Sequence, residues 1–261
     1  MCMFIDSHCH LDFDVFDEQR DSLMLSCLEN KVAGFLVPAT TFVSWSKLAT
    51  LIKRYPEWRA AYGLHPYFLT EASLDQVDFL AEQCDTPRVV AVGEIGLDCW
   101  PNAVDMRVQL DFFSRQLKVA KSLKLPVILH ARKSYDLVFK CLRETGFKEG
   151  GVVHAFNGSI EQAERFIDLG FVLGIGGTVT YSRAQKAHRV LASLSDNAFI
   201  LETDSPDMPL QGLQGKNNTP LSIPLIAQCV AMIREESVEH IAVQTYDNLL
   251  RVFPRWNEDL L

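Results

Sequence analysis

Short apolar runs that end in a histidine or an acidic residue recur along this chain. In residues 127–130 and 152–154, aliphatic and β-branched side chains are followed directly by His130 and His154. Continuous apolar runs of this kind are typical of buried parallel strands. Five predicted strand ends carry the candidate metal ligands, which are His8, His10, Glu94, His130, His154 and Asp204. Because the carboxyl ends of the strands in a parallel barrel meet at one rim, the pattern predicts a closed barrel with a metal centre there.

His8 and His10 are separated by one residue, Cys9, just after the first predicted strand. Residues i and i+2 of a strand point to the same face, so both imidazoles can converge on one ion while Cys9 points away. Cys9 is therefore expected to be a small buried residue without a catalytic role. An isolated histidine is more often a hydrogen-bonded core residue than a ligand, but four strand-end histidines together with two acids favour the metal interpretation.

Strand-like and helix-like segments alternate along the whole chain. Eight predicted strands end near residues 6, 37, 62, 92, 129, 153, 173 and 201, and the clearest helices are predicted over residues 104–125, 160–169, 224–235 and 238–253. This rhythm of βαβ units predicts an α/β chain that folds as a (β/α)8-type TIM-like barrel, regular or distorted. A length of 261 residues fits one barrel, so residues 1–261 are predicted to form a single domain.

The longest irregular stretch of the chain, residues 205–224, follows the strand end that carries Asp204. It contains two glycines, two asparagines and three internal prolines. Loops of this length in compact domains are usually functional, so this loop is expected to fold over the metal.

The overall charge restricts the partners that the chain can bind. Its 25 Lys and Arg residues against 33 Asp and Glu give a net charge of −8 and a pI near 5.4. An acidic protein has no broad electrostatic attraction for nucleic acid, so extensive duplex binding is not expected. A nuclease that binds only the end of a strand is compatible with this charge, because bound metal and a few local cations would supply the attraction.

Cysteine usage and hydropathy bear on the compartment. The seven cysteines are scattered, odd in number and without a C-x-x-C pair, which argues against a disulfide framework and a thiolate zinc site. The amino terminus lacks the basic and apolar regions of a signal peptide, and no apolar stretch approaches the roughly 18 residues of a membrane helix. A soluble, cytoplasmic protein is predicted, without membrane contact and with no obligate protein partner evident.

Six segments resemble the TatD-type metal-dependent hydrolases, a family of amidohydrolase-like barrels. They are residues 5–12 (IDSHCHLD), 63–66 (GLHP), 93–98 (GEIGLD), 125–132 (LPVILHAR), 154–158 (HAFNG) and 202–206 (ETDSP). The likeness covers essentially the whole chain in the family's motif order, and residues 202–209 (ETDSPDMP) are most similar to the YjjV-like branch. The resemblance implies a barrel with two divalent metal cations per chain. It implies a first site of His8, His10, Glu94 and Asp204, and a second of Glu94, His130 and His154, with Glu94 bridging.

The donor types agree with that chemistry independently of the family. Imidazoles and carboxylates suit zinc, manganese or iron, whereas magnesium prefers oxygen ligands, so the metal identity stays open among these four. A bound metal can lower the pKa of water from about 15.7 to about 7. Asp204 is the candidate to hold the first metal and accept the water's proton, and Glu94 is the second candidate catalytic residue. Many amidohydrolase relatives bridge their two metals with a modified lysine. In this chain Glu94 occupies the corresponding strand end, so the resemblance requires no modified lysine.

Other polar residues near the predicted rim have more than one interpretation. His65 could contact substrate, support a ligand or simply hydrogen-bond in a turn before a proline. Arg132 and its neighbour Lys133 could bind phosphate or form a solvated pair at a helix start. Asp98 could orient a ligand or cap its turn, and Trp100 could stack a base or cover the core edge. Asn248, in the last predicted helix, is expected to anchor that helix rather than to take part in catalysis.

Three functions are compatible with the sequence. The leading hypothesis is a two-metal hydrolase of phosphodiesters, a deoxyribonuclease that trims DNA ends, with DNA ends or a small phosphodiester as its partner. The alternative is an amidohydrolase-type enzyme for a small amide, ester or lactone, because the attacking water is common to both and specificity lies in the loops. A non-catalytic metal-dependent binding protein is disfavoured, since all six candidate ligands are present.

Overall fold

The computed structural model describes residues 3–71, 74–86, 88–101 and 103–260. Within them, parallel strands form one eight-stranded sheet in chain order. The strands are β1 (Phe4–Asp6), β2 (Val32–Pro38), β3 (Trp58–Tyr62), β4 (Val89–Asp98), β5 (Val127–Arg132), β6 (Gly151–Val153), β7 (Phe171–Ile175) and β8 (Phe199–Leu201). The predicted (β/α)8-type barrel is confirmed.

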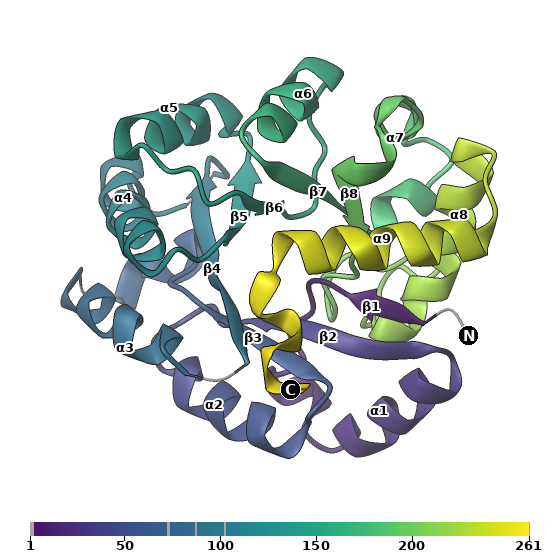
Figure 1. The fold of residues 1–261 in the computed structure, drawn as a ribbon, viewed down its shortest axis with the longest axis horizontal. Helices are drawn as coiled ribbons and strands as arrows, with labels where there is room; N and C mark the ends of the chain where they lie inside the picture. The colour runs from purple at the N-terminus through teal and green to yellow at the C-terminus, as the bar shows by residue number, and fades with distance from the viewer. Residues whose placement is uncertain (1–2, 72–73, 87, 102, 261) are drawn as a thin grey trace.

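Helices surround the strands on the outside of the barrel (Figure 1). They are α1 (Arg20–Glu29), α2 (Ser44–Arg54), α3 (Leu80–Cys84), α4 (Met106–Leu123), α5 (Tyr135–Thr145), α6 (Ile160–Asp168), α7 (Gln185–Ser193), α8 (Ile223–Arg234) and α9 (Val238–Val252). The four helices predicted most clearly correspond to α4, α6, α8 and α9. Ser159 begins α6 with a capping box, and Ser237 caps α9 by accepting from the His240 amide. None of the helices in the described ranges is long and apolar enough to cross a membrane.

The first and last strands of the barrel are joined by hydrogen bonds at and just beyond their carboxyl ends. The Ser7 amide donates to the Leu201 carbonyl at 3.0 Å, and the Asp204 amide donates to the His8 carbonyl at 2.9 Å. The chain segments that follow β1 and β8 are therefore hydrogen-bonded to each other at the carboxyl-terminal rim. This closure places the predicted ligands of the two strand ends side by side.

The amino-terminal end of the barrel is covered by α9. Fully buried side chains inside the barrel form one apolar cluster with the end of this helix and with Trp256 of the following 3-10 helix η7 (Pro254–Leu260). The cluster includes Leu36, Val90, Ile128, Val152, Val172, Ile200, Leu249, Val252 and Phe253. In Figure 1, α9 crosses in front of the strands. The opposite, carboxyl-terminal rim is thus the end left for chemistry, as in other barrels of this type.

β4 differs from its prediction, because it extends to Asp98 rather than ending near residue 92. Val92 pairs with Val127 and Ile95 pairs with Leu129, so β4 uses three steps where β5 uses two. Such a bulge re-aims the side chains of the longer strand. Glu94 lies in this bulge, and it therefore sits inside the strand rather than at its end.

We expect Asn248→Ala to destabilise the fold without changing the rim. The Asn248 side chain is 5% exposed, and its amide nitrogen donates to the carbonyls of Asp196 (2.7 Å) and Phe199 (2.8 Å), which ties α9 to the start of β8. Loss of these bonds should lower the free energy of unfolding in urea by about 1–3 kcal/mol. The exposed neighbour Asp247 is the control, and Asp247→Ala should stay within about 0.5 kcal/mol of wild type. Equal stability of the two variants would contradict the anchoring role.

Candidate metal centre

Four polar side chains converge where β1, β4 and β8 meet at the rim. His8 Nε2 lies 3.3 Å from His10 Nε2, 3.2 Å from Glu94 Oε2 and 3.6 Å from Asp204 Oδ1. His10 Nε2 lies 3.7 Å from Glu94 Oε2 and 3.5 Å from Asp204 Oδ1. Tetrahedral zinc with bonds of about 2.0–2.1 Å separates its ligand atoms by about 3.3–3.4 Å. His8, His10 and Asp204 thus form one group whose ligand atoms lie within 4.8 Å of one another, and Glu94 contacts both of its histidines.

A second group shares Glu94 with the first. Glu94 Oε1 lies 3.0 Å from His130 Nδ1 and 3.2 Å from His65 Nε2, while its Oε2 faces His8 and His10. The two oxygens of one buried carboxylate therefore face different pairs of histidines. His65, which the sequence left between a substrate contact and a turn residue, belongs to this second group.

His154 is placed beside Asp204 rather than beside His130. Its Nε2 lies 3.5 Å from Asp204 Oδ1, and its ring stacks on His8 with centroids 3.6 Å apart. Among the described acidic, histidine and cysteine side chains, His154 clusters with His8 and Glu202, whereas His130 clusters with His65 and Glu94. The joint binding of a second metal by His130 and His154 stays a prediction.

Hydrogen bonds fix the rings of the candidate ligands. His10 Nδ1 lies 3.2 Å from the Pro38 carbonyl, an arrangement in which Nδ1 donates and Nε2 is left as a lone-pair donor toward the site. His130 Nε2 lies 3.0 Å from Asp98 Oδ2, so Asp98 orients this ring. Cys9 is fully buried and its thiol faces the Leu36 carbonyl at 3.7 Å, away from the two histidines.

Glu202 is a site residue that the sequence analysis missed. It is 1% exposed, and its Oε1 accepts from the Ala155 amide at 2.6 Å and lies 3.0 Å from His154 Nδ1. A Cβ at Gly174 would lie 2.1 Å from Glu202 Oε2, so only glycine leaves room for this carboxylate. The signal was present in the sequence, because Glu202 and Asp204 share the i, i+2 spacing of His8 and His10.

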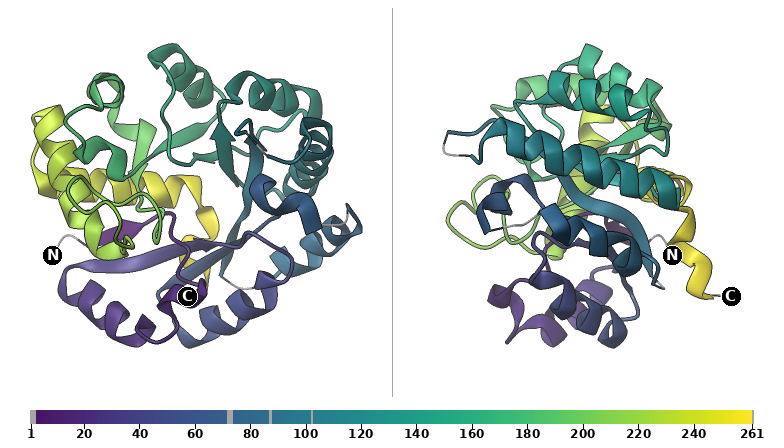
Figure 2. Two further views of the ribbon diagram at one scale, coloured as in Figure 1. Left: turned by 180° about the vertical axis from the view of Figure 1, so that it is seen from behind. Right: turned by 90° about the vertical axis from the view of Figure 1, so that its left-hand side faces the viewer.

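A cavity of about 610 Å³ opens over both groups. Its other lining residues include Phe13, Tyr67, Phe68 and Arg132, and Asp207 and Met208 from the loop after β8. Only the start of that loop reaches the cavity, while residues 211–215 at its tip are exposed. In the right view of Figure 2, the loop and η7 lie at opposite ends of the molecule.

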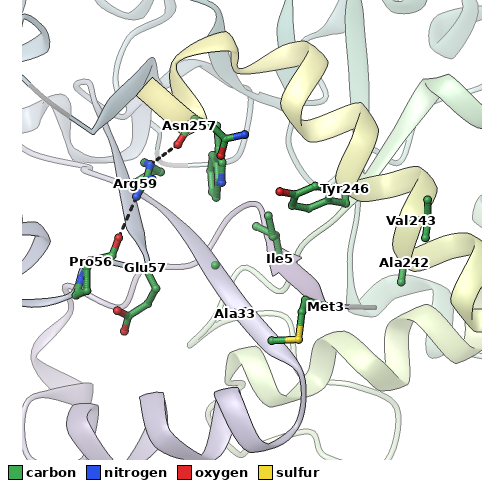
Figure 3. Close-up of a pocket in the computed structure, with 12 residues that line it drawn as sticks. Met3, Ile5, Ala33, Pro56, Glu57, Arg59, Ala242, Val243, Tyr246 and Asn257 are labelled. Atoms are coloured by element: carbon green, nitrogen blue, oxygen red, sulfur yellow. Dashed lines mark hydrogen bonds between the residues drawn. The ribbon is translucent and has the colours of Figure 1, made fainter. Parts of the chain in front are cut away.

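A second cavity, of about 540 Å³, lies at the other end of the barrel. Ile5 of β1, Arg59 of β3 and Tyr246 of α9 line it, as Figure 3 shows. Arg59 is 5% exposed there, and its guanidinium donates to the carbonyls of Trp256 (2.7 Å) and Pro56 (3.0 Å). The described lining of this cavity contains no histidine, so the candidate ligands belong to the carboxyl-terminal rim alone.

Almost the whole chain is similar to known proteins of one family. Residues 5–254 match the family model described as TatD related DNase. The chain belongs to the TatD family. It is 39% identical over 256 residues to the uncharacterized metal-dependent hydrolase YjjV of Escherichia coli K12, covering 97% of this chain and 98% of the relative. It is 29% identical over 252 residues to YabD of Bacillus subtilis 168, another uncharacterized metal-dependent hydrolase, covering 96% and 99%.

Solved structures give the same assignment. The crystal structure of YjjV, a TatD homologue from Escherichia coli K12, has a TM-score of 0.92 and 38% identity, covering 97% of this chain and 98% of that one. A TatD family hydrolase from Entamoeba histolytica has a TM-score of 0.85 and 22% identity, covering 96% and 98%, and it shows the shared fold alone. The TatD resemblance seen in the motifs is confirmed, and the chain is a metal-dependent hydrolase of this family.

The protonation states of this TatD-family site follow from burial and close pairing. Burial lowers the pKa of His65 to about 4 and also lowers the pKa of His8. Burial acts in the same direction on His10, but bonding to Asp204 and the charges of Asp204 and Glu94 outweigh it and raise the pKa of His10 to about 9. Burial would raise the pKa of the Glu94 and Asp204 carboxyl groups, yet the surrounding histidines hold both pKa values below their usual range. Both acids are therefore ionised and ready to bind a cation.

Metal binding by the TatD-family site should release protons and strengthen with pH. Below its pKa of about 9, His10 carries a proton that must leave before Nε2 can bind a metal. We therefore expect the apparent affinity to rise from about pH 6 to about pH 9, with proton release measured by calorimetry in buffers of different ionisation enthalpy. His10→Ala should release fewer protons than wild type. An affinity that is constant over this range would contradict the expectation.

Glu202 should support metal binding through His154. We expect Glu202→Ala to weaken the affinity for metal about 10- to 100-fold, the usual effect of removing a partner behind a ligand. Gly174→Ala should have a similar effect without removing a charge, because the new Cβ would displace Glu202. Gly176→Ala is the matched control, since its Cβ would meet no atom closer than 3.4 Å. Metal titration of the folded variants measures the difference, and equal affinities for Gly174→Ala and Gly176→Ala would exclude this role.

Proposed function

We propose that this TatD-family chain is a two-metal phosphodiesterase that removes nucleotides from DNA ends. The observation that carries the proposal is the division of the Glu94 carboxylate, whose Oε2 faces His8 and His10 while its Oε1 faces His65 and His130. A shared carboxylate suits two adjacent divalent cations, an arrangement that can bind both the attacking and the leaving oxygen of a phosphodiester. Zinc, manganese, magnesium and iron all remain candidate metals.

The candidate ligands divide between the two cations. His8, His10, Glu94 and Asp204 would hold the first, and Glu94 and His130 would hold the second. His65 lies close enough to Glu94 to join that second set, and His154 lies close enough to Asp204 to join the first. When bound, the cations supply charge stabilisation to a phosphoryl oxygen and acidify a water molecule.

The proton from that water is assigned to Asp204. Its carboxylate is ionised because the charge of His154 and bonding to His10 and His154 outweigh the effect of burial on its pKa. Its side chain is 16% exposed and lines the cavity, whereas Glu94 is 2% exposed and is enclosed by histidines. Both acids line the cavity, and Asp204 is the more exposed of the two, so we assign the proton to Asp204 and the positioning of the metals to Glu94.

The walls of the cavity favour a nucleotide over a small lactone. Tyr67 and Phe68 are 57% and 39% exposed and line the opening, where a flat nucleobase could stack on them. Arg132 lines the same cavity and offers a cation for phosphate. The net charge of −8 disfavours contact with a long duplex, so the end of a flexible single strand is the substrate that these features fit. The printed name of the matched family, TatD related DNase, supports the same choice.

We expect metal-dependent trimming of end-labelled single-stranded DNA, with little cutting of closed circular duplex. The assay compares Mg²⁺, Mn²⁺ and Zn²⁺, and includes bis-nitrophenyl phosphate, a lactone, an ester and an amide. Asp204→Asn should lower kcat by about 100-fold or more, the general-base range, and serves as the control for contaminating nucleases. Turnover of the lactone, ester or amide without trimming of any oligonucleotide would replace the nuclease proposal with the amidohydrolase alternative.

A further inference from the structure

Arg132 and Trp100 meet at the mouth of the cavity. Arg132 is the last residue of β5 and is paired with Asp98, the last residue of β4. Trp100 lies two residues after Asp98, in the loop that follows β4. The guanidinium carbon of Arg132 lies 3.6 Å from the centroid of the Trp100 ring, a close stacking distance. The two residues lie in separate segments of the sequence, and the structure joins them into one unit.

The loop that carries Trp100 is held in place by hydrogen bonds. The Trp100 amide donates to Asp98 Oδ1 at 2.8 Å, and the Cys99 amide donates to the Arg132 carbonyl at 3.0 Å. Asp98 Oδ1 is thus occupied by the Trp100 amide, and Asp98 Oδ2 lies 3.0 Å from His130 Nε2. These bonds fix the backbone that carries Trp100, and the ring of Trp100, which is 43% exposed, packs on the Arg132 guanidinium.

Among the residues that the structure describes, none accepts a hydrogen bond from the Arg132 guanidinium. In the described part of the chain, its guanidinium makes no hydrogen bond or ion pair with another side chain or carbonyl. Arg20 and Arg234 differ, since each donates to carbonyls and pairs with an acid. The planar guanidinium of an arginine that is stacked, half-buried and has free N–H groups can donate two parallel hydrogen bonds to an anion such as phosphate.

The position of the pair relative to the metal centre selects which phosphate it meets. Arg132 follows His130 by two residues on the same strand, so both side chains leave β5 on the same face. Arg132 lines the cavity, but Trp100 is not among the residues that line it, so the stacked guanidinium lies at the mouth. A scissile phosphate would bind between the metal groups, whereas a neighbouring phosphate along the strand would reach the mouth.

We propose that Arg132, held flat by Trp100, binds the phosphate next to the scissile one in a single-stranded nucleotide substrate. The inference rests on the proposed phosphodiesterase function. It assigns to Arg132 and Trp100 the preference for substrates that carry a second phosphate beside the scissile one. Stacking fixes the plane of the guanidinium before the substrate arrives, so less side-chain freedom is lost on binding. Substrates with a single phosphate have no group for this site.

The test compares Arg132→Met with Arg183→Met. Arg183 is a matched control because it also lies over an aromatic ring, that of Tyr181 at 5.3 Å, but it is exposed and does not line the cavity. Both changes remove one positive charge. Binding is measured with the metal-loaded protein and a fluorescent single-stranded DNA that has cleavage-resistant phosphorothioate linkages, over a range of salt concentrations. Turnover is measured on natural single-stranded DNA and on bis-nitrophenyl phosphate.

Arg132→Met should weaken DNA binding about 10- to 100-fold and reduce the slope of log affinity against log salt by about 0.7. Its effect on kcat/KM for bis-nitrophenyl phosphate should be smaller than its effect on DNA, because that substrate has one phosphate and no second group for this site. Arg132→Lys should recover part of the affinity but not all, since lysine keeps the charge and loses the planar fork. Trp100→Leu should weaken DNA binding by an intermediate factor, and Arg183→Met should match wild type.

Equal DNA affinity and salt slope for Arg132→Met and Arg183→Met would overturn the inference. A loss on bis-nitrophenyl phosphate as large as the loss on DNA would also overturn it, because it would show a general disturbance of the metal site. The two proposals can fail separately. Trimming of DNA that does not depend on Arg132 would retain the nuclease function and remove the phosphate subsite. Arg132-dependent binding without cleavage of any phosphodiester would retain the subsite and remove the nuclease function.

Discussion

The buried carboxylate of Asp6 joins the first and last strands of the barrel, and the metal centre depends on that link. Its Oδ1 accepts from the amides of Thr203 (3.0 Å) and His8 (3.3 Å), and its Oδ2 accepts from the Thr203 hydroxyl at 2.5 Å. Residues from the two ends of the chain are thereby fixed at one height on the rim. His8 is one of these hydrogen-bonded residues, and His10 and Asp204 follow them closely in the chain. The positions of three of the four candidate ligands of the first metal therefore depend on the Asp6 carboxylate.

The bulge in β4 supplies the other constraint. A regular strand would pair each residue of β4 with one of β5, but the extra residue between Val92 and Ile95 turns Glu94 toward the histidines. Gly96 then allows the strands to resume pairing, because a Cβ there would lie 1.9 Å from the His130 carbonyl oxygen. The bulge thus positions both oxygens of Glu94. Because each oxygen contacts one group of candidate ligands, the two groups lie next to each other.

The sequence predicts the barrel and the gathering of six candidate ligands, because both follow from local patterns. Apolar runs specify the strands, and alternation brings His8 and His10 to one face. The detailed grouping does not follow from such patterns. His65 lies beside Glu94 because of how the loop after β3 folds, and His154 turns toward Asp204 because Glu202 contacts its ring from behind. These placements depend on contacts with side chains from other strands. Local sequence patterns do not show which side chains of different strands will meet.

Local charge at the rim has to act against the charge of the whole molecule. With a net charge of −8, the protein repels a polyanion at a distance, and salt weakens this repulsion over roughly 10 Å. For the DNA end proposed as the substrate, attraction would therefore arise at short range, from bound cations and from an arginine whose donors are already oriented. Arg132 meets this requirement because Trp100 holds it at the mouth of the cavity. Few contacts of this kind favour a flexible strand end, which can bring one phosphate to the metals and the next to the arginine, over a duplex whose phosphates are fixed along a rigid surface.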